Sequence, residues 1–459
     1  MKERDSYPVN IAGAGLAGSL MAVYLAQKGL SVNVYERRPD MRISGAQGGR
    51  SINLALSVRG IHALKETGME AAVMKMAIPM YGRMIHDETG DQTFQPYSRD
   101  RKSCIYSVSR GDLNMSLMSM AESHPNVHFH FNKQCDTMDF DTGELVLKDL
   151  QSGEKVTAPG AVTLACDGAF SAVRYDMQKT PRFDFSQSYL AHGYKELTIP
   201  PGPGGSFLLE KHALHIWPRG NYMMIALPNP DGSFTCTLFF PFEGENSFAG
   251  LTTPGEVEAF FVKNFPDAVP LMPDLLEDFF RNPTSSLVTI RCFPWVWKDK
   301  VALIGDAAHA IVPFFGQGMN AAFEDCTVMN ECIDRYGSDW EEVFAVYQRE
   351  RKDNADAIAK MALENFVEMR DTVADDRFLF LKKVEHLLGQ HFVPYYSRYE
   401  LVSFSRVPYA DAYRRGQINQ EILEILTRDL TNIDEIDYKL AETLINERLG
   451  ADFSIPGFA

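Results

Sequence analysis

The sequence predicts an α/β fold in which a dinucleotide-binding domain, assembled from separate stretches of chain, is interrupted by an antiparallel sheet. Three observations predict it. A glycine-rich turn at residues 13–18 follows the first apolar segment, two more strand-to-turn motifs occur at residues 167 and 305, and short β-like runs with turn signals occupy residues 193–240. Residues 340–450 are mostly helical in pattern, so we also expect a helical C-terminal region.

The first glycine-rich turn lies between two apolar runs. Val9–Ala12 precedes it, a helical pattern over residues 19–28 follows, and the second run, Ser31–Tyr35, ends at Glu36. This order is Rossmann-like. The glycines allow a tight turn, approach of a pyrophosphate and close helix packing, and the acid accepts hydrogen bonds from ribose hydroxyls. The predicted cofactor-binding residues here are Gly13, Gly15, Leu16, Ala17, Gly18, Glu36, Arg37 and Arg38.

The composition argues against several classes of function. The formal net charge of −16 over 459 residues disfavours nucleic-acid binding, which needs clustered cations. The seven cysteines include no CxxC pair, so we expect reduced thiols rather than disulfides or a zinc site. His212 and His215 form an HxxH pair without a third ligand nearby, and we interpret them as core or rim histidines and predict no metal.

No targeting segment is evident. Residues 1–8 lack the apolar region of a signal peptide, and no stretch reaches the roughly 18 apolar residues of a membrane span. Residues 432–459 are acidic and mixed, without a tail anchor. We therefore expect a soluble, cytoplasmic protein, either a monomer or a homodimer.

After Glu36 the pattern alternates between loops and short elements. In the loop over residues 37–49, Gly48–Arg50 is either a solvated segment or a mobile one close to the cofactor. Arg59–Met69 predicts a helix, and residues 80–96 predict short strands and turns.

A further helix is predicted after the β-like run Ile105–Val108. Ser109 or Asp112 can cap it, and Arg110 either reaches a phosphate or is a surface arginine. The alternating runs Val127–Phe131 and Leu145–Leu147 predict a small sheet with hairpins. The strand Val162–Ala165 leads to Asp167-Gly168, and Ser171 can cap the helix that follows.

The middle of the chain predicts a second domain inserted into the first. Its expected strands, arranged as an antiparallel meander, are Gly193–Ile199, Phe207–Glu210, Ala213–Trp217, Tyr222–Leu227 and Phe234–Phe240, with helices over Thr253–Asn264 and Ala268–Phe280. Strands at Leu287–Cys292 and Val301–Ile304 then return to the first domain, and a helix follows over Ala321–Tyr336. The expected divisions are 1–78, 98–180 and 285–370 for the cofactor domain, 79–97 and 181–284 for the substrate sheet, and 371–459 for the helical region.

Three turn motifs at separate strand ends suit a cofactor made of two nucleotides. The first holds the adenosine diphosphate, and Asp306 can bind a ribityl hydroxyl. The helix start at Gly316–Asn320 can direct N–H groups at a flavin pyrimidine edge, where negative charge accumulates on reduction.

The order of these motifs resembles the flavoprotein monooxygenases of the aromatic hydroxylase type. The blocks that resemble the kynurenine 3-monooxygenase family more closely are 49–56, 192–196, 214–218, 312–320 and 362–365. The resemblance spans residues 9 to about 416. It implies a Rossmann-like FAD-binding domain with further cofactor contacts at Arg50, Asn53, Leu56, Arg110, Cys135, Asp167, Asp306, Gly316, Gly318, Met319 and Asn320.

The resemblance also implies a reaction and a pocket. NADPH reduces tightly bound FAD, O2 forms a flavin C4a-hydroperoxide, and L-kynurenine is hydroxylated to 3-hydroxykynurenine. Arg83 and Tyr97 match positions that bind the substrate carboxylate, whereas a lone arginine in a hairpin would otherwise be a surface charge. The apolar positions that match the pocket wall are Leu214, Met223, Ile225, Leu227, Phe239, Pro313 and Phe314. Ordinary core packing is the alternative for each of them.

Two polar candidates remain open. Asn365 lies on an apolar helix face and needs a hydrogen-bond partner, which is either structural or an amino-acid group of the substrate. Tyr399 matches the family only by the end of its block, because Tyr395 and Tyr396 leave the register undecided.

Rival functions are another flavin hydroxylase or oxidase acting on a related aromatic amino acid, and a non-catalytic flavin-binding protein. Trp295-Val296-Trp297 is interpreted as packing rather than a halogenase motif, and no Ser-His-Asp set lies on a nucleophile elbow. The pattern identifies neither an NADPH docking site nor a membrane-anchoring helix like that of eukaryotic members.

Overall fold

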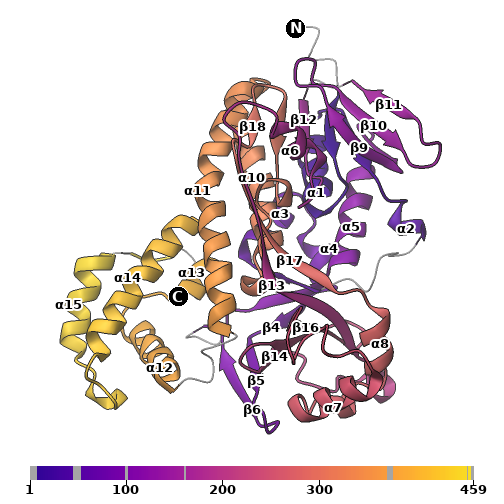
Figure 1. The fold of residues 1–459 in the computed structure, drawn as a ribbon. Coiled ribbons are helices and arrows are strands. Elements are labelled where there is room, and N and C mark those ends of the chain that lie inside the picture. The colour runs from indigo at the N-terminus through magenta and orange to yellow at the C-terminus, as the bar shows by residue number, and fades with distance from the viewer. Residues whose placement is uncertain are drawn as a thin grey trace. The chain divides into compact units, whose positions relative to one another are not determined.

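The computed structural model describes residues 8–44, 53–98, 102–159, 162–369, 376–451 and 453–455. The chain divides into two compact units, each made of three stretches (Figure 1). Unit 1 comprises residues 1–77, 108–190 and 286–359, and unit 2 comprises residues 78–107, 191–285 and 360–459.

Unit 1 is built on a six-stranded sheet with the order β18-β19-β12-β1-β2-β8. Its strands are β1 (Val9–Ala12), β2 (Val32–Glu36), β8 (Val127–Phe131), β12 (Val162–Ala165), β18 (Val296–Trp297) and β19 (Val301–Leu303). All neighbours are parallel except β18 and β19. Since β1 and β12 are buried at every position, they are the apolar runs expected of a sheet covered on both faces.

Helices and a smaller sheet cover this sheet. Helix α1 (Leu16–Gln27) packs against α5 (Arg110–Glu122) and α10 (Gly318–Tyr336), and α10 also contacts α3 (Val58–Glu66). The three-stranded sheet contains β9 (Lys133–Met138), β10 (Leu145–Asp149) and β11 (Lys155–Ala158), and α6 (Ala172–Met177) contacts β9. The remaining elements of unit 1 are α2 (Met41–Ser44), β3 (Asn53–Leu56), α4 (Glu70–Met74), α9 (Asp306–His309), η4 (Pro313–Phe315) and most of α11 (Trp340–Val367).

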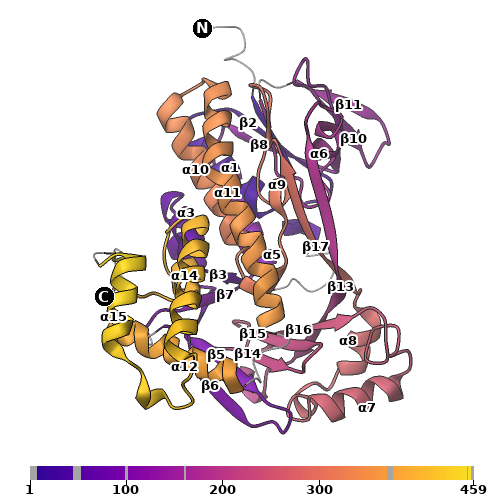
Figure 2. The ribbon, with the colours of Figure 1, turned by 60° about the vertical axis from the view of Figure 1, so that its left-hand side comes forward.

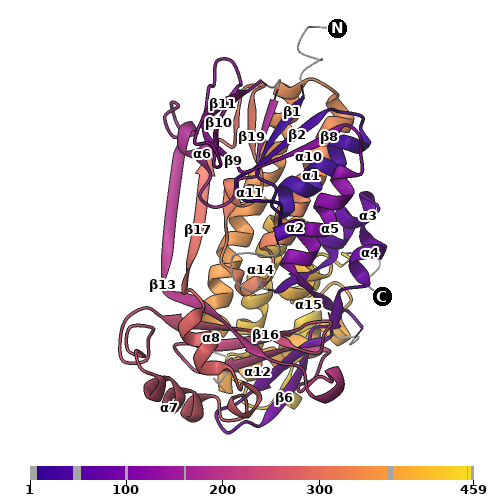
Figure 3. The ribbon, with the colours of Figure 1, turned by 90° about the vertical axis from the view of Figure 1, so that its right-hand side faces the viewer.

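Unit 2 contains most of a seven-stranded sheet with the order β17-β13-β16-β15-β14-β5-β6. Its strands are β5 (Gly82–His86), β6 (Gln92–Pro96), β13 (Asp184–Ile199), β14 (Ala213–Pro218), β15 (Met223–Pro228), β16 (Phe234–Pro241) and β17 (Ser285–Phe293). The neighbours β13 and β17, side by side in Figure 3, are two of the strands in which the chain passes between the units. Two further strands, β4 (Ile78–Met80) and β7 (Ile105–Ser109), pair antiparallel.

Helices complete unit 2. Helices α7 (Pro254–Asn264) and α8 (Leu275–Arg281), with the short η3 (Val269–Leu271), bury aromatic side chains against one face of the sheet. The C-terminal helices α12 (Asp376–His391), α14 (Tyr409–Thr427) and α15 (Tyr438–Leu449) share their own apolar cluster and are drawn together in yellow in Figure 2. The other C-terminal elements are α13 (Arg398–Ser403) and η6 (Ile433–Glu435).

Most predicted elements are confirmed, but three predictions about single segments are wrong. Val127–Phe131 is not part of a hairpin sheet, because it follows the crossover helix α5 and so pairs parallel with β2. Phe207–Glu210 is not a strand: Phe207 and Leu209 pack against the apolar cluster from a loop. The helix expected over Ala268–Phe280 is two short helices, because Pro270 and Pro273 interrupt it.

The inserted sheet is also not purely antiparallel. Strands β14, β15 and β16 form the expected meander, but β5 pairs parallel with β14 because it comes from an earlier pass of the chain. No helix among the described residues combines the length and apolar character needed to cross a bilayer.

Candidate functional site

The three glycines of the first turn in unit 1 differ in their surroundings. Gly13 has φ +96°, and a Cβ there would lie 2.5 Å from the carbonyl oxygen of Cys166. A Cβ on Gly18 would lie 2.0 Å from the carbonyl oxygen of Gly13, so helix and strand meet at van der Waals distance. Beside Gly15, in contrast, a Cβ would meet no atom of the described residues within 4 Å. The turn therefore leaves open space at its middle glycine, where a pyrophosphate approaches in this motif.

Helix α1 begins at Leu16, directly after this turn. Its N-cap residue, Gly15, provides no side-chain capping hydrogen bond, and Leu16 and Ala17 are only half-buried. The N–H groups of its first turn and the positive end of the helix dipole are thus available to an anionic group.

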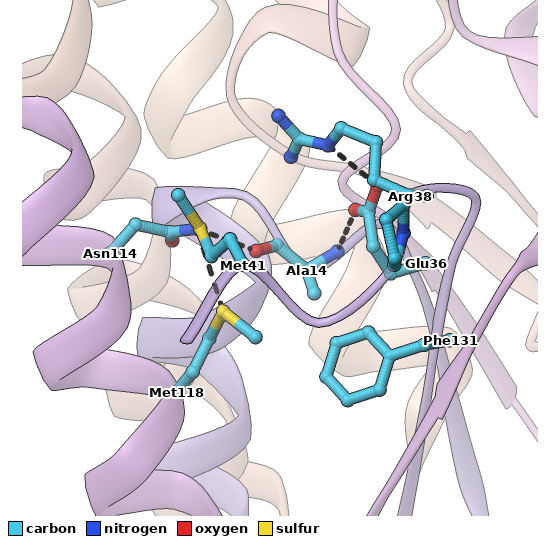
Figure 4. A pocket seen from close by; sticks show the side chains of 8 residues that line it. Ala14, Glu36, Arg38, Met41, Asn114, Met118 and Phe131 are labelled. Atoms are coloured by element: carbon cyan, nitrogen blue, oxygen red, sulfur yellow. Dashed lines mark hydrogen bonds and ion pairs between the residues drawn. The ribbon is translucent and has the colours of Figure 1, made fainter. Parts of the chain in front are cut away.

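Glu36, at the end of β2, lies beside the first glycine turn and is hydrogen-bonded to it. Its Oε2 accepts a hydrogen bond from the Ala14 N–H at 3.0 Å, and its Oε1 accepts from the backbone N–H and the Nε of Arg38, both at 2.9 Å (Figure 4). Burial alone would raise the pKa of Glu36, but the hydrogen bonds and charge of Arg38 lower it below its ordinary value. Glu36 is therefore an anionic acceptor. Arg37 and Arg38 are exposed beside it.

A pocket lies at this point, and the sequence analysis identified only part of its lining. Figure 4 shows the lining residues Ala14, Glu36, Arg38, Pro39, Met41, Asn114, Met118 and Phe131. Asn114 Nδ2 donates to the carbonyl oxygen of Ala14 at 3.0 Å, which links α5 to the glycine turn. The residues from α2, α5 and β8 were missed because no local motif marks them. The parallel pairing of β8 with β2, which brings Phe131 beside Glu36, was the missing information.

The second turn presents a carboxylate with an unused oxygen. Asp167 Oδ2 accepts from the Ala172 N–H at 2.8 Å, whereas Oδ1 is buried without a hydrogen-bond partner among the described residues. Burial raises the pKa of Asp167. Burial and the negative charge of Asp167 also raise the pKa of the Cys135 thiol, so both side chains lie in one environment. Ser171 caps α6 as predicted, by accepting from the Arg174 N–H at 2.9 Å.

The third turn is held by a buried acid that the sequence analysis did not single out. Asp325 Oδ2 accepts from the Gly305 N–H at 3.0 Å and from His309 Nε2 at 2.5 Å. One carboxylate oxygen thus bonds the residue before α9 and the last residue of α9. Its other oxygen accepts from Arg351 Nε at 2.7 Å. Asp306 begins this fixed helix and is exposed, which leaves its carboxylate accessible to a ligand.

The glycine-rich start of α10 is fixed to β3 by Asn320. Asn320 Oδ1 accepts from the Ser57 N–H at 2.9 Å, and Nδ2 donates to the carbonyl oxygens of Ala55 and Gly316 at 2.8 and 3.0 Å. Since Asn320 is fully buried, its side chain positions the neighbouring backbone. Gly316 has φ +66°, and the N-cap Gln317 makes no side-chain capping hydrogen bond to α10.

The other predicted cofactor residues lie around these turns. In unit 1, Asn53, Leu56 and Met319 are buried, Gly318 is half-buried, and Arg110 is exposed at the start of α5. Arg50 lies outside the described residues. An elongated dinucleotide such as FAD requires several separate contacts along its length. Unit 1 offers open space at Gly15, the Asp167 Oδ1 without a partner among the described residues, and two helix starts without a side-chain cap.

Unit 2 brings Arg83, Tyr97 and Tyr399 together. The Cζ atom of Arg83 lies 5.2 Å from the ring centre of Tyr399 and 5.8 Å from that of Tyr97, and the two rings stack at 5.0 Å. Arg83 Nε and the Tyr97 hydroxyl are buried and have no hydrogen-bond partner among the described residues. A guanidinium N–H and a neighbouring hydroxyl, both without partners among the described residues, are suited to bind a carboxylate.

The charge states of this cluster suit an anionic ligand. Burial would lower the pKa of Arg83, but the neighbouring tyrosines and the Glu368 carboxylate raise it. Burial raises the pKa values of Tyr97 and Tyr399, so both hydroxyls keep their protons. Glu368 was missed by the sequence analysis, although it follows Asn365 by one helical turn. Phe404 was also missed; its ring lies 5.9 Å from that of Tyr399.

The structure distinguishes the three tyrosines of the undecided register. Tyr395 belongs to the apolar cluster of the C-terminal helices, and the Tyr396 ring contacts Phe453. Only Tyr399 stacks near Arg83. Asn365 is buried on α11, and its Nδ2 lies 3.4 Å from the weak acceptor Sδ of Met369.

Strand register places the predicted apolar wall on the same face of the sheet as Arg83. Leu214 is directly opposite Arg83 in the parallel pair of β14 and β5. Ile216 on the same face pairs with Ile225, and Met223 pairs with Phe239. Side chains on one face alternate along a strand, so this face presents Arg83, Leu214, Met223, Ile225, Leu227 and Phe239. Pro313 and Phe314 lie in η4 of unit 1, exposed and buried respectively.

Trp295, which the sequence analysis interpreted as packing, lies in the core. Its Nε1 donates to the carbonyl oxygen of Cys292 at 2.8 Å. All seven cysteines are free thiols. No group of three or more potential ligands in the described part of the chain is arranged to hold a metal ion.

Comparison with known proteins identifies relatives along almost the whole chain. The family model "FAD binding domain" matches residues 6–193 and 291–362. A kynurenine 3-monooxygenase from Myxococcus xanthus (strain DK1622) is 52% identical over 450 residues, which cover 98% of this chain and 97% of that protein. One from Dictyostelium discoideum is 52% identical over 457 residues, covering 96% and 98%.

Solved structures share the fold. A 2-methyl-3-hydroxypyridine-5-carboxylic acid oxygenase in its tetrameric form matches with a TM-score of 0.65 at 20% identity, covering 81% of this chain and 95% of that chain. PqsL of Pseudomonas aeruginosa, described as a probable FAD-dependent monooxygenase, matches with a TM-score of 0.64 at 19% identity, covering 80% and 97%.

Proposed function

Because this chain belongs to the kynurenine 3-monooxygenase family, we propose that it is an FAD-dependent monooxygenase that converts L-kynurenine to 3-hydroxykynurenine with NADPH and O2. The observation that carries the proposal is the 52% identity to a kynurenine 3-monooxygenase over 98% of the chain. Arg83 Nε and the Tyr97 hydroxyl, which have no partner in the described part of the chain, support it independently, since the substrate carries a carboxylate.

FAD, when bound, supplies the redox chemistry that takes a hydride from NADPH and activates dioxygen. The residues proposed to hold it are those of the three turns of unit 1. The N–H groups of α1 and Gly15 receive the pyrophosphate, Glu36 accepts from the ribose hydroxyls, and Asp306 accepts from the ribityl chain. The uncapped start of α10 stabilises negative charge on the pyrimidine edge.

We propose that side chains of unit 2 orient the substrate. Arg83 and the hydroxyls of Tyr97 and Tyr399 bind the carboxylate, and the face that carries Leu214, Ile225 and Phe239 excludes water from the aromatic ring. Asn365 is proposed to contact an amino-acid group of the substrate. The ring is an electron-rich arylamine, so the protein must orient it rather than supply a covalent nucleophile. The cofactor and substrate ranges expected from the sequence remain part of this proposal.

The test measures NADPH oxidation by the purified yellow protein with and without L-kynurenine, followed by mass analysis of the product. The expected result is stimulated oxidation with the gain of one oxygen atom. Stimulated oxidation that yields only hydrogen peroxide would identify kynurenine as an effector and a related aromatic amino acid as the substrate. Oxidation that L-kynurenine leaves unchanged would refute the assignment, while FAD content measured on the same sample reports separately on the cofactor.

A further inference from the structure

Two buried histidines form a continuous chain of hydrogen bonds on the face of the sheet opposite Arg83. His86 Nδ1 lies 2.6 Å from Asp267 Oδ2, His86 Nε2 lies 2.8 Å from His215 Nδ1, and His215 Nε2 lies 2.8 Å from the carbonyl oxygen of Glu210. Both imidazoles are fully buried. The assigned function uses neither of them.

The protons in this chain can be counted from its two ends. The carbonyl oxygen of Glu210 only accepts, so His215 Nε2 carries a hydrogen. Asp267 accepts from Trp217 Nε1 at 3.0 and 3.1 Å, so its carboxylate acts as an acceptor, and the 2.6 Å contact with His86 places a hydrogen on His86 Nδ1 as well. The hydrogen bond between His86 Nε2 and His215 Nδ1 requires a third hydrogen on one of these two nitrogens. Two neutral imidazoles carry two N–H hydrogens, so three hydrogens on these four nitrogens amount to one positive charge.

The surroundings favour this charge on His86 rather than on His215. His86 is next to the carboxylate and stacks on the Trp217 ring at 4.0 Å, an arrangement that stabilises a cation. Burial lowers the pKa of His215 to about 4. The other charged groups facing the pair are Arg219, whose Nη1 donates to the His86 carbonyl oxygen at 2.9 Å, and the Glu210 carboxylate, which accepts from the His212 N–H.

The histidine pair lies on the opposite face of the sheet from Arg83, at the end of the same strand. His86 and Arg83 are both on β5, and their odd spacing places them on opposite faces. The pair connects β5 to β14 through His215 and to the segment between α7 and η3 through Asp267. Arg219 also donates to the carbonyl oxygen of Asp87 at 2.7 Å, so the end of β5 is held through side chain and backbone.

We propose that His86 and His215 together hold one positive charge at neutral pH, and that this charge, paired with Asp267, fixes the strand that presents Arg83. His86 is then a positioning residue for the substrate carboxylate, a role that rests on the proposed function of Arg83. Loss of the proton breaks one of the three hydrogen bonds and loosens β5.

A neutron crystal structure of the perdeuterated holoenzyme at pH 7.5 tests the charge without any substitution. The expected result is deuterium on His86 Nδ1, His86 Nε2 and His215 Nε2. Only two deuterons on the four nitrogens would overturn the proposal, whatever the enzyme's substrate proves to be.

The positioning role is tested with 4-(2-aminophenyl)-4-oxobutanoate, the kynurenine skeleton without its titrating α-amino group. In the unmodified enzyme, its inhibition constant should rise at alkaline pH as the extra proton leaves. In His86→Gln that constant and the KM for kynurenine should be raised by roughly tenfold already at pH 7.5, with kcat changed less than twofold and FAD content retained. His128→Gln, at an exposed histidine on β8, should match the unmodified enzyme.

The outcomes separate the two proposals. Unchanged binding in a folded His86→Gln protein, or an inhibition constant that stays flat with pH in the unmodified enzyme, would refute the positioning role. If His86→Gln fails to fold, Asp267→Asn removes the counter-charge and must raise the same constants. Failure of kynurenine to stimulate turnover in the unmodified enzyme would instead concern the proposed function.

Discussion

The two faces of the seven-stranded sheet are made by alternating residues of the same strands, yet they differ in how completely their side chains are packed and hydrogen-bonded. One face is filled by Trp217, Met224, Leu238 and Phe240, each fully buried beneath α7 and α8. The other presents Arg83, Leu214 and Ile225, which are only half-buried, beside Met223, Leu227 and Phe239, which are buried. Alternation along a strand therefore allows one segment to contribute stability on one side and binding on the other.

The polar groups on the two faces also differ in how completely they are hydrogen-bonded. On the packed face, the described hydrogen bonds form closed sets, as in the chain from Asp267 through His86 and His215 to the Glu210 carbonyl. On the other face, Arg83 Nε and the Tyr97 hydroxyl are buried but unpartnered among the described residues. Satisfied groups fix a structure, whereas unsatisfied donors indicate where a ligand completes it.

The largest expected effect is a loss of folding stability when a side chain of the packed face is truncated. Phe240→Ala should lower the free energy of unfolding by about 3–5 kcal/mol, because it leaves a cavity among Tyr222, Phe248 and Phe260. Urea denaturation measures this. Phe280→Ala, at an exposed ring on α8, should cost less than about 1 kcal/mol. Equal losses in the two variants would contradict the asymmetry of the faces.

The next effect is a dependence of stability on pH that originates on the packed face. Burial lowers the pKa of His215 to about 4, against about 6.5 in the unfolded chain. The unfolded chain therefore takes up this proton first, and the stabilisation is complete above about pH 6.5 and is lost as the pH falls towards 4, by up to about 3 kcal/mol. Unfolding free energies of His215→Gln should fall less steeply with acid. Identical slopes for the variant and the unmodified enzyme would exclude this origin.

On the ligand face, the largest effect should come from Arg83→Met. Removing the guanidinium deletes a charged hydrogen-bond donor to the carboxylate, so the KM for L-kynurenine should rise roughly 100-fold, or about 2.7 kcal/mol. Steady-state kinetics and FAD content measured together should show binding of substrate affected and binding of FAD unaffected. Arg414→Met, at an exposed ion pair with Asp411, is the matched control and should leave KM unchanged.

The smallest effect distinguishes two buried hydroxyls without hydrogen-bond partners among the described residues. Tyr97→Phe should raise the KM for L-kynurenine by roughly fivefold, about 1 kcal/mol, because one neutral donor to the carboxylate is lost while the ring still stacks on Tyr399. Tyr395→Phe removes an equally unpartnered hydroxyl from the apolar cluster of the C-terminal helices and should leave KM unchanged. A rise in both variants would show that the hydroxyl acts through folding rather than through the ligand.

Much of unit 1 could be predicted because its signals are local. The positive φ of Gly13, the helix that starts at Leu16 and the cap at Ser171 depend on neighbouring residues. The acid Glu36 follows from the length of one strand–helix–strand unit. Asn114 and Phe131, which line the same pocket, carry no local signal, because they arrive from a separate helix and a parallel strand.

In unit 2 the sequence predicted strands and their apolar alternation, and the family resemblance pointed to Arg83 and Tyr97. It left Tyr395, Tyr396 and Tyr399 undecided, because all three occur within five residues and only packing separates a core ring from a ring beside Arg83. It also treated His215 as a core or rim residue, without its partner His86, which lies 129 positions away.

By itself, the sequence determined most of the turns, most of the strands and helices, and the glycines of the first turn, because backbone sterics and periodicity act over a few residues. The tertiary structure decided which face of the inserted sheet is packed, which carboxylate holds the Gly305-Asp306 turn and which two histidines are hydrogen-bonded to each other. Those outcomes depend on burial and on pairing between residues far apart in the chain, and neither exists until the strands have found their neighbours.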